Sequence, residues 1–500
     1  MNTIIFLDKN IKELFSHGDI YEIAKNIEGK IYRQTANRIT KEFNYKGKNY
    51  FIKYHGGIGW KEVFKNLFKL TLPTIGAKRE WKAINRLNQL NIKCPEVAAV
   101  CFRGLNPANS ESFLITKSLI NTISLEEALQ QRRYQSLTFK EKKEFIIKIA
   151  DISKAMHDGG VNHRDYYLCH FHIDKRLDIK KDIYLIDLHR AQIRTAVPSR
   201  WSEKDIGGLF HSALGFDLTE RDLYRFLSAY FKLPIREILY KKQSFVRNTV
   251  KRAFSMYMKP LLKEISFSYH KKQPFNSDLV QGDDGKSRWI AKKEFFTKEM
   301  REVIINLGHF MKKGSVVKDE AGHQIVKINI KNQEFFIKKY QKKNLFHILR
   351  KFFSKTRAYN SWLASYWLRA AGINTFEIAC VYEEYNALTT LDSYIISESL
   401  EGLRLDEASK YEENSLMISA KIHALFKRLL WIGFNHGDAK SSNFFFSKNS
   451  LITFDLDNSR QINLSFFFKR SRARDVKRIL RSFLYSDKIY SFLDKRLNNS

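Results

Sequence analysis

The sequence predicts an α+β fold made of two tandem domains, each with a small antiparallel-sheet lobe followed by a larger helical lobe. Two observations lead to this prediction. The chain has 500 residues, enough for two or three domains that each bury a core. One order of sequence elements also occurs twice along it, which indicates an internal repeat. We therefore expect domains at residues 1–265 and 299–500, joined by a basic linker at 266–298.

Each repeat begins with a β-hairpin. Residues 38–54 and 324–340 both show alternating side chains on either side of a short polar turn. The second strand of each hairpin carries a lysine, Lys53 or Lys338. In isolation, a strand lysine is usually a solvated edge residue, so these two are informative only together with the later elements of each repeat.

A basic, aromatic helical stretch and then a longer helix come after each hairpin. The basic stretches are residues 60–70 and 343–353, and the longer helices carry Glu80-Trp81 and Ser361-Trp362. No Asp or Glu occurs between residues 335 and 376. The second repeat therefore lacks an acid equivalent to Glu80. Each repeat continues through an apolar strand into a polar crossover that ends near Leu119 or Leu400, and an acidic helix start comes next.

Two polar loops are the most informative feature of the chain. They are His163-Arg164-Asp165 and His436-Gly437-Asp438, and each precedes an apolar strand that ends in an aspartate, Asp187 or Asp455. A His-x-Asp loop followed by a strand-terminal aspartate is typical of phosphoryl transfer in the kinase superfamily. Two such pairs in the same order predict two kinase-like units that use ATP and Mg²⁺.

The layout suggests a role for each residue. Asp165 and Asp438 are the expected catalytic bases, and Asp187 and Asp455 are the expected Mg²⁺ ligands. Lys53 and Lys338 are expected to bind the ATP phosphates, with Glu80 holding Lys53 in place. Further cofactor-binding residues are expected at the two crossovers: Lys117 and Leu119 in the first, Glu398 and Leu400 in the second.

The place five residues after each base differs between the repeats. Kinase loops put a metal-binding Asn there, and Asn443 occupies it in the second repeat. His170 occupies it in the first, although Mg²⁺ prefers oxygen ligands. Lys440 is placed to lie along the transferred phosphate. Asp205 and Asp475 either brace the catalytic loops or are ordinary acids at helix starts.

Several protein-kinase motifs are missing. Neither lysine follows a Gly-x-Gly-x-x-Gly loop, neither strand aspartate is followed by Phe-Gly, and no Ala-Pro-Glu occurs. A segment that docks peptide substrates is therefore not expected. A small-molecule or glycan acceptor is favoured over a protein, with a protein kinase-like enzyme kept as an alternative.

The net charge of +34 restricts the partners. Nucleic acid, an anionic membrane surface or a polyanionic substrate would each suit it. The basic residues are spread through both halves, and no zinc-ligand spacing or RNA-binding aromatic motif accompanies them. We therefore expect no nucleic acid partner, although a basic lipid- or nucleic-acid-binding scaffold with a pseudokinase second domain is the alternative from another class.

The cellular compartment is predicted from features that the sequence lacks. The four cysteines form no Cys-x-x-Cys pair, which suits a reducing compartment. Asp8 comes too early for a signal peptide, and no window approaches the ~18–20 apolar residues of a membrane span. A cytoplasmic protein is expected.

Residues 160–171 and 186–192 closely resemble the lipopolysaccharide core heptose kinases, Gram-negative enzymes that phosphorylate an inner-core heptose with ATP. Further similarity lies at Gly76 to Trp81, Asn106-Pro107 and Arg200-Trp201. The resemblance covers about residues 30 to 240. It implies phosphorylation of heptose I by the first domain, and His170 belongs to its pattern.

The second domain resembles, more distantly, the wider lipopolysaccharide-kinase group, on Gly433 to Asp438 and Asn443-Phe444. The implied substrate is a second heptose or the Kdo sugar. Because Lys338 lacks an acidic helix partner, the domain is either an active kinase with a rearranged lysine site or a pseudokinase.

The implied partner is the anionic lipopolysaccharide core at the cytoplasmic face of the inner membrane. Trp60, Phe64, Leu67 and Phe68 lie among lysines, as in a segment that docks at a membrane interface. An ordinary amphipathic helix packed on the small lobe, with a solvated basic face, explains this stretch equally well.

Overall fold

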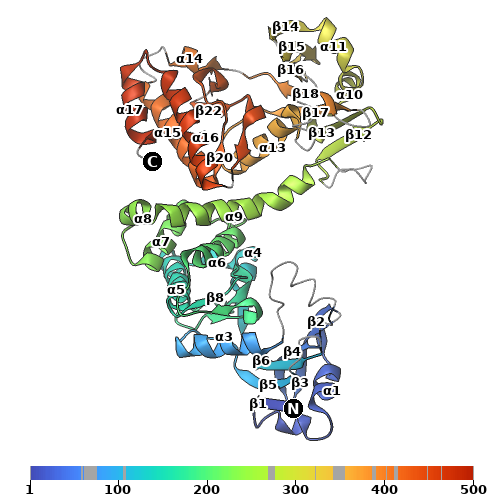
Figure 1. Ribbon diagram of the computed structural model, residues 1–500, viewed down its shortest axis with the longest axis vertical. Helices are drawn as coiled ribbons and strands as arrows, with labels where there is room; N and C mark the ends of the chain where they lie inside the picture. The colour runs from blue at the N-terminus through green and yellow to red at the C-terminus, as the bar shows by residue number, and fades with distance from the viewer. Residues whose placement is uncertain are drawn as a thin grey trace. The chain divides into compact units, whose positions relative to one another are not determined.

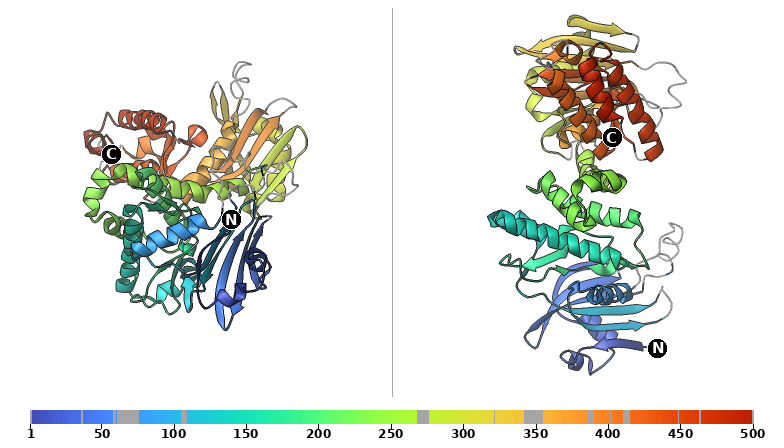
Figure 2. Two further views of the ribbon diagram at one scale, coloured as in Figure 1. Left: turned by 60° about the horizontal axis from the view of Figure 1, so that its bottom comes forward. Right: turned by 90° about the vertical axis from the view of Figure 1, so that its left-hand side faces the viewer.

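The computed structural model describes residues 2–35, 37–57, 60, 76–104, 109–267, 276–320, 322–341, 355–385, 390–400, 402–409, 415–447, 449–462 and 464–498. They form two compact units, Met1–Ala253 and Phe254–Ser500, and the boundary lies inside helix α9 (Gln243–Glu264). Each unit has a sheet-containing small lobe and a helical large lobe (Figures 1 and 2). The predicted fold class is thereby confirmed.

The small lobe of unit 1 is a six-stranded antiparallel sheet. Its order is β1-β5-β6-β4-β3-β2. Tyr21 of helix α1 packs edge-on against Phe113 inside the apolar core on one face. The elements are β1 (Asn2–Leu7), α1 (Ile20–Asn26), β2 (Lys30–Thr35), β3 (Arg38–Tyr45), β4 (Lys48–His55), β5 (Val97–Arg103) and β6 (Glu111–Lys117).

Helix α3 (Lys78–Gln89) separates the sheet of unit 1 from its helical lobe (Figure 1). Ala83, Ile84 and Leu87 form its buried stripe, at the spacing of an amphipathic helix. Glu80 is buried on the same helix, with only 4% of its surface exposed. A carboxylate in that position requires a cationic partner.

The large lobe of unit 1 is built on helix α5, which begins with a capping box between Thr138 and Glu141. Short strands between the helices hold the catalytic loop beside the loop that carries Asp187, because β8 pairs with β11 and β9 pairs with β10. The elements are β7 (Thr122–Ser124), α4 (Leu125–Gln130), α5 (Phe139–Asp158), β8 (Val161–Asn162), β9 (Phe171–Asp174), β10 (Tyr184–Leu185), β11 (Gln192–Ile193), α6 (Ser199–Ala213), α7 (Glu220–Phe231) and α8 (Ile235–Lys241).

The small lobe of unit 2 is a seven-stranded antiparallel sheet in the order β12-β13-β17-β18-β16-β15-β14. Its first two strands lie within residues 266–298, the segment expected to be a basic linker, so this segment contributes to the sheet. The elements are β12 (Leu279–Asp283), β13 (Ser287–Lys292), α10 (Lys298–Ile305), α11 (Leu307–Lys313), β14 (Ser315–Glu320), β15 (His323–Ile330), β16 (Gln333–Tyr340), α13 (Arg357–Ala370), β17 (Ile378–Tyr385) and β18 (Thr390–Glu398).

The large lobe of unit 2 packs around α15, whose buried side chains include Ile418, Ile422 and Phe426. Strands β20 and β23 pair as β8 and β11 do in unit 1. The elements are β19 (Leu403–Arg404), α14 (Leu405–Ala408), α15 (Ser415–Ile432), β20 (Phe434–Asn435), β21 (Phe444–Ser447), β22 (Ser450–Thr453), β23 (Arg460–Gln461), α16 (Ser465–Arg481) and α17 (Asp487–Leu497).

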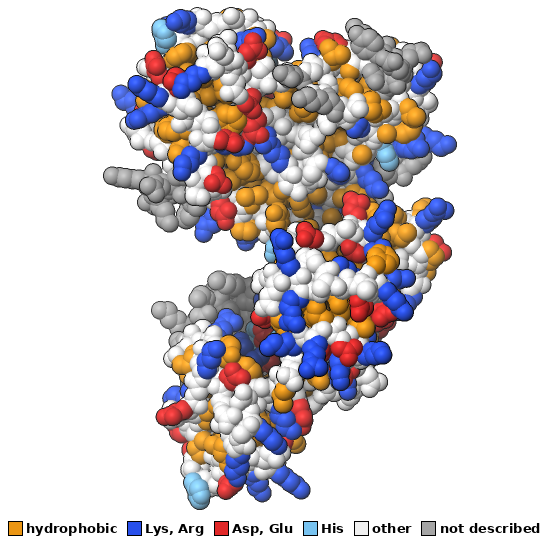
Figure 3. All heavy atoms as spheres, turned by 180° about the vertical axis from the view of Figure 1, so that it is seen from behind, with side chains coloured by type: hydrophobic (Ala, Val, Ile, Leu, Met, Phe, Trp, Pro, Cys, Tyr) orange, Lys and Arg blue, Asp and Glu red, His pale blue; other side chains and the backbone are white. Residues whose placement is uncertain are grey.

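Apart from Trp60, the basic stretches at 60–70 and 343–353 lie outside the described residues, as does Asn106-Pro107. In the part of the chain that the structure describes, no helix has the length and apolar character needed to cross a membrane. Lys and Arg side chains are spread over both units in the view of Figure 3, in keeping with the even distribution of basic residues along the sequence.

Candidate functional site

Three charged side chains meet in unit 1. Lys53 Nζ lies 2.6 Å from Glu80 Oε1 and 2.9 Å from Asp187 Oδ1. The contacts tie strand β4 and helix α3 to the loop after β10. Burial would lower the pKa of the Lys53 ammonium, but the charges of Glu80 and Asp187 outweigh burial and raise it. Lys53 therefore stays protonated and can face phosphate.

Asp187 is kept ionised by its neighbours. Burial alone would raise its pKa, but a hydrogen bond from His189 and the charge of Lys53 hold the pKa below its usual range. The His189 Nδ1 lies 2.7 Å from Asp187 Oδ1. Asp187 also has a left-handed backbone, with φ of 58°, which costs a non-glycine residue ~1–2 kcal/mol. Such strain is characteristic of functional loops.

Asp165 and His170 complete the site of unit 1. The Arg190 guanidinium lies 2.7 Å from Asp165 Oδ1. His170 Nδ1 donates to the carbonyl oxygen of Asp165 at 2.6 Å, so in the neutral ring the lone pair is on Nε2. That nitrogen lies 3.8 Å from Asp187 Oδ2. His170 therefore links the backbone at Asp165, the expected base, to the neighbourhood of Asp187.

Asp205 braces the catalytic loop rather than starting a helix. It lies within α6, is 1% exposed, and accepts hydrogen bonds from the backbone N–H groups of His163 (2.7 Å) and Arg164 (2.8 Å). In unit 2, Asp475 of α16 accepts from the N–H of Gly437 at 2.9 Å. The sequence left both interpretations open because burial is invisible in it.

Among the described residues, the lysine of unit 2 has one carboxylate partner instead of two. Lys338 Nζ lies 2.5 Å from Asp455 Oδ1, and the absence of any acid from α13 excludes a partner equivalent to Glu80. The helix is instead tied to the loop by Arg357, whose Nε lies 2.6 Å from Asp457 Oδ2. Asn360 Nδ2 donates to the backbone oxygen of Asp457 at 2.7 Å. This link was not predicted, although Asp455-Leu456-Asp457 and the arginine at the helix start are visible in the sequence.

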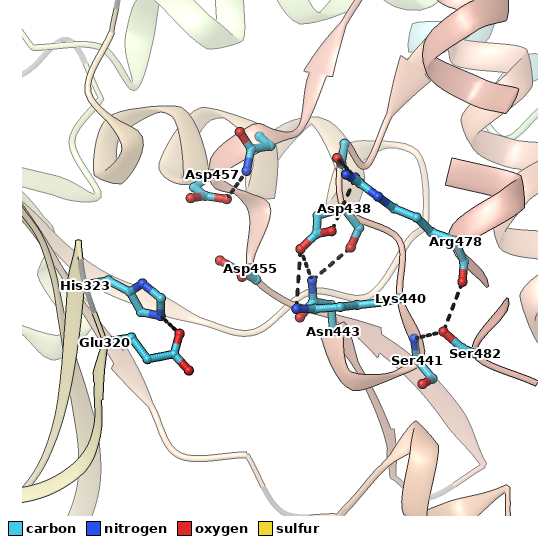
Figure 4. Close-up of polar contacts among 12 residues, drawn as sticks. Glu320, His323, Asp438, Lys440, Ser441, Asn443, Asp455, Asp457, Arg478 and Ser482 are labelled. Atoms are coloured by element: carbon cyan, nitrogen blue, oxygen red, sulfur yellow. Dashed lines mark hydrogen bonds and ion pairs between the residues drawn. The ribbon is translucent and has the colours of Figure 1, made fainter. Parts of the chain in front are cut away.

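Asp438, the expected base of unit 2, lies among three polar side chains (Figure 4). Asn443 Nδ2 donates to the backbone oxygen of Asp438 at 2.8 Å and to its Oδ2 at 3.0 Å. Lys440 Nζ lies 3.7 Å from Oδ2, and Arg478 Nη1 lies 3.3 Å from Oδ1. The structure therefore brings Asp438, Lys440 and Asn443 together.

Asp455 and Asp457 interact as like charges. Burial raises the pKa of Asp457, and the negative charge of Asp455 raises it further. The pKa of Asp455 is lowered, because the charge of Lys338 outweighs the effect of burial. The carboxylate of Asp457 is already engaged by Arg357 and Asn458, whereas Asp455 and Asn443, the metal ligands expected from the sequence, offer the oxygen atoms that Mg²⁺ prefers. Their assignment to metal binding stays a prediction.

The β14–β15 hairpin carries a carboxylate–imidazole pair at its tip. Glu320 Oε2 lies 3.5 Å from His323 Nε2, and Asp455 lies between this pair and Asp438 in the view of Figure 4. The pKa of His323 is lowered by burial and by the positive charge of Lys338. This hairpin is where kinases cover the phosphates, so Glu320 and His323 extend the site beyond the residues expected from sequence.

The crossover residues lie away from the charged clusters. Lys117 pairs with Glu96 and Asp8, and it lies three residues along β6 from Leu114, the partner of Lys53 in the sheet register. Three strand residues span ~10 Å. Glu398 accepts a hydrogen bond from Gln333, and Leu119 and Leu400 are half-buried. Their role in cofactor binding stays a prediction.

Comparison with known proteins gives matches in both units. The model of the lipopolysaccharide kinase (Kdo/WaaP) family matches residues 23–230 and again 310–496. The lipopolysaccharide core heptose(I) kinase WaaP of Escherichia coli is 36% identical over 265 residues, which are 52% of this chain and 100% of that enzyme. Its Pseudomonas aeruginosa counterpart is 39% identical over 256 residues, 51% of this chain and 96% of that enzyme.

A solved structure, WaaP in complex with acyl carrier protein, is 35% identical to this chain, with a TM-score of 0.44, and the match covers 50% of this chain and 98% of the other.

Proposed function

This chain belongs to the lipopolysaccharide kinase (Kdo/WaaP) family, and on that basis we propose that its first unit phosphorylates the first heptose of the lipopolysaccharide core. The chain is an ATP-dependent kinase of lipopolysaccharide core sugars. The assignment to heptose I is supported by two heptose(I) kinases that match about half of the chain over nearly their whole length.

The geometry that best supports this activity is the Lys53–Glu80–Asp187 cluster. In the proposed mechanism Lys53 binds the ATP phosphates while Glu80 fixes its position. Asp165 accepts the proton of the heptose hydroxyl as that oxygen attacks the γ-phosphorus and ADP leaves. Asp187 and His170 would hold a Mg²⁺ ion, and the bound ion would neutralise charge on the phosphates. Arg190 holds the Asp165 carboxylate in one orientation.

The second unit is proposed to phosphorylate another core sugar, a second heptose or Kdo. The observation that favours catalysis is the joint presence of Lys338 on Asp455, Arg357 on Asp457, and Asn443 on Asp438. A pseudokinase would need none of these contacts for phosphate or metal chemistry. Lys440 is placed to neutralise the transferred group.

We also propose that the protein acts at the cytoplasmic face of the inner membrane of a Gram-negative bacterium. The net charge of +34 supports attraction to anionic lipid and to the anionic core. The acceptor is itself attached to a lipid, so a protein at the surface would meet it there.

The test is the pattern of core phosphates in a strain that lacks the gene. Complementation with the full chain carrying Asp165→Asn should remove phosphate from heptose I only, and complementation with Asp438→Asn should remove it from a different sugar. Mass spectrometry of the isolated core locates both. Unchanged heptose I phosphate in the first strain would refute the assignment of unit 1.

A further inference from the structure

Unit 1 has a basic pocket next to its catalytic loop. Its volume is about 560 Å³, and its lining residues come from α3 and from the segment around β11: Lys78, Arg79, Lys82, Ala191, Gln192, Ile193 and Arg194. Four of these seven described residues are cationic, and none of the seven is acidic. The pocket adjoins the catalytic base, because Ala191 directly follows Arg190, the ion-pair partner of Asp165.

A second group of cations continues from the pocket. The indole ring of Trp201 on α6 has four cationic groups within 6 Å of its centre: Arg164 (5.6 Å), Arg194 (5.1 Å), Arg200 (5.2 Å) and Lys204 (4.1 Å). Arg194 belongs to both groups. Arg164 also lies close enough to Arg79 for their positive charges to repel, since the pKa of Arg79 is lowered by burial and by the charge of Arg164. The two groups therefore form one continuous positive surface, here called the basic pocket.

The buried carboxylate of Asp205 is close enough to act on Arg194 by its charge, but the cations of the basic pocket form no ion pair among the residues that the structure describes. Across the described ranges, no ion pair joins an acid to Lys78, Arg79, Lys82 or Arg194. Arg194 donates instead to the amide oxygens of Asn162 and Gln192. Neutral acceptors hold the guanidinium in place without cancelling its charge. Positive groups held close together in this way favour a bound anion.

Arg164 occupies a backbone position that suits glycine. Its φ is 75°, in the left-handed region. The equivalent residue of unit 2 is Gly437, with φ of 87°, which adopts this conformation without strain. Unit 1 thus holds a strained arginine where unit 2 has a glycine. A strained residue of this kind points to a function of its side chain.

We propose that the basic pocket binds phosphate or carboxylate groups that the acceptor glycolipid already carries, and so holds the heptose hydroxyl beside Asp165. This inference rests on the proposed function of unit 1. It assigns acceptor recognition to anionic substituents away from the reacting hydroxyl. The planar guanidinium groups of Arg79 and Arg194 suit bidentate contact with such oxygens.

The test is steady-state kinetics of the purified full chain. Arg79→Ala and Lys82→Ala, alone and combined, should raise the KM for a phosphate-bearing core acceptor about 10-fold or more, since each removes a charge-assisted contact. The KM for ATP should change less than twofold. Lys140→Ala, an exposed lysine on the first turn of α5, is the matched control. An unchanged acceptor KM in the double variant would overturn the proposal.

A second acceptor distinguishes bound phosphate from bound carboxylate. It lacks the phosphates but keeps the heptose I hydroxyl free. The wild-type protein should show a higher KM for the dephosphorylated acceptor than for the phosphorylated one. On the dephosphorylated acceptor, the KM of the double variant should equal that of wild type. If the double variant is equally impaired on both acceptors, the carboxylates of the acceptor are the bound groups. If wild type and variant do not differ on either, the pocket does not recognise the acceptor.

Direct binding keeps the inference testable should unit 1 prove inactive on heptose. With both nucleotide sites filled by a non-hydrolysable ATP analogue, calorimetry with pyrophosphate should show binding that weakens about 10-fold in Arg79→Ala and not in Lys140→Ala. Equal binding by all three proteins would overturn the pocket. Loss of binding in Arg79→Ala without heptose transfer by wild type would instead refute only the proposed function.

Discussion

The guanidinium of Arg357 donates a 2.6 Å hydrogen bond to Asp457, and this contact joins the small-lobe helix of unit 2 to the loop that carries Asp455. In unit 1 the same two elements are joined through Lys53, by Glu80 on the helix and Asp187 on the loop. The helix thus contributes a negative charge in one unit and a positive charge in the other. Unit 2 therefore needs no acid on α13.

Arg357→Gln should reduce turnover by unit 2, because it frees α13 from the loop and leaves Asp457 as a buried unpaired carboxylate beside Asp455. Only the carboxylate of the pair is buried, and the Arg357 side chain is 39% exposed, so solvent screening makes the cost smaller than that of breaking a fully buried pair. Asp457→Asn should rescue part of the loss, and a double-mutant cycle on kcat measures the coupling. Additive effects of the two substitutions would show that the contact has no role in unit 2.

Lys53→Met should abolish phosphorylation by unit 1, since nothing else described near Asp187 can replace its charge on the phosphates. Glu80→Gln should raise the KM for ATP and lower kcat in part, because Lys53 keeps Asp187 as a partner 2.9 Å away. Kinetics of the two full-length variants, with unit 2 silenced by Asp438→Asn, make the comparison. If Glu80→Gln leaves the KM for ATP and kcat unchanged while Lys53→Met is inactive, the functional role of the Lys53–Glu80 pair is refuted. The role of Lys53 itself is not.

Asp165→Asn should slow transfer to heptose I by ~10²–10⁴-fold, the usual value of a positioned general base. The amide retains the shape of the carboxylate, so the unfolding transition should move little. Rapid-quench measurement of the chemical step is the appropriate assay. A chemical step of normal rate in this variant would mean that Asp165 is not the base.

The stability of unit 1 should fall as the pH drops below 6.5. Burial, with the charges of Arg38 and Lys53, lowers the pKa of His55 to about 3. Between pH 6.5 and that value the unfolded chain binds a proton that the folded state excludes, so His55 costs up to ~1.4 kcal/mol of stability per pH unit. Chemical unfolding at pH 7 and pH 5 should show a smaller loss in His55→Gln, whereas His17→Gln, at an exposed position, should behave as wild type.

Binding to vesicles should require anionic lipid and should weaken with salt, because exposed charges are screened beyond ~8 Å at physiological ionic strength. The net charge of +34 motivates this prediction. Flotation with neutral and with anionic vesicles at two salt concentrations checks it. Salt-insensitive binding to neutral vesicles would instead indicate an apolar anchor.

The sequence was sufficient to predict the fold class and the family, because hydrophobic periodicity and two short motifs identify a kinase-like unit without tertiary information. The clustering of Lys53, Glu80 and Asp187 agrees with that order of elements. The assignment of these residues to phosphate and metal binding stays a prediction.

Other features depend on packing. The Arg357–Asp457 contact joins residues 100 positions apart. In this contact the helix carries the cation and the loop carries the acid, so the absence of an acid from the helix does not predict it. Strands β12 and β13 lie in a basic segment whose composition resembles a linker. The brace formed by Asp205 depends on its burial, and the basic pocket requires α3 and β11 to lie together.

Gly437 restricts which substitutions the catalytic loop of unit 2 can accept. A β-carbon at this residue would lie 2.5 Å from the backbone oxygen of Asn458, which cannot move aside as a side chain could. Any larger residue at position 437 would therefore push against the loop after Asp455. Substitutions that change the acceptor of unit 2 are accordingly tolerated more easily at the residues around Gly437 than at Gly437 itself.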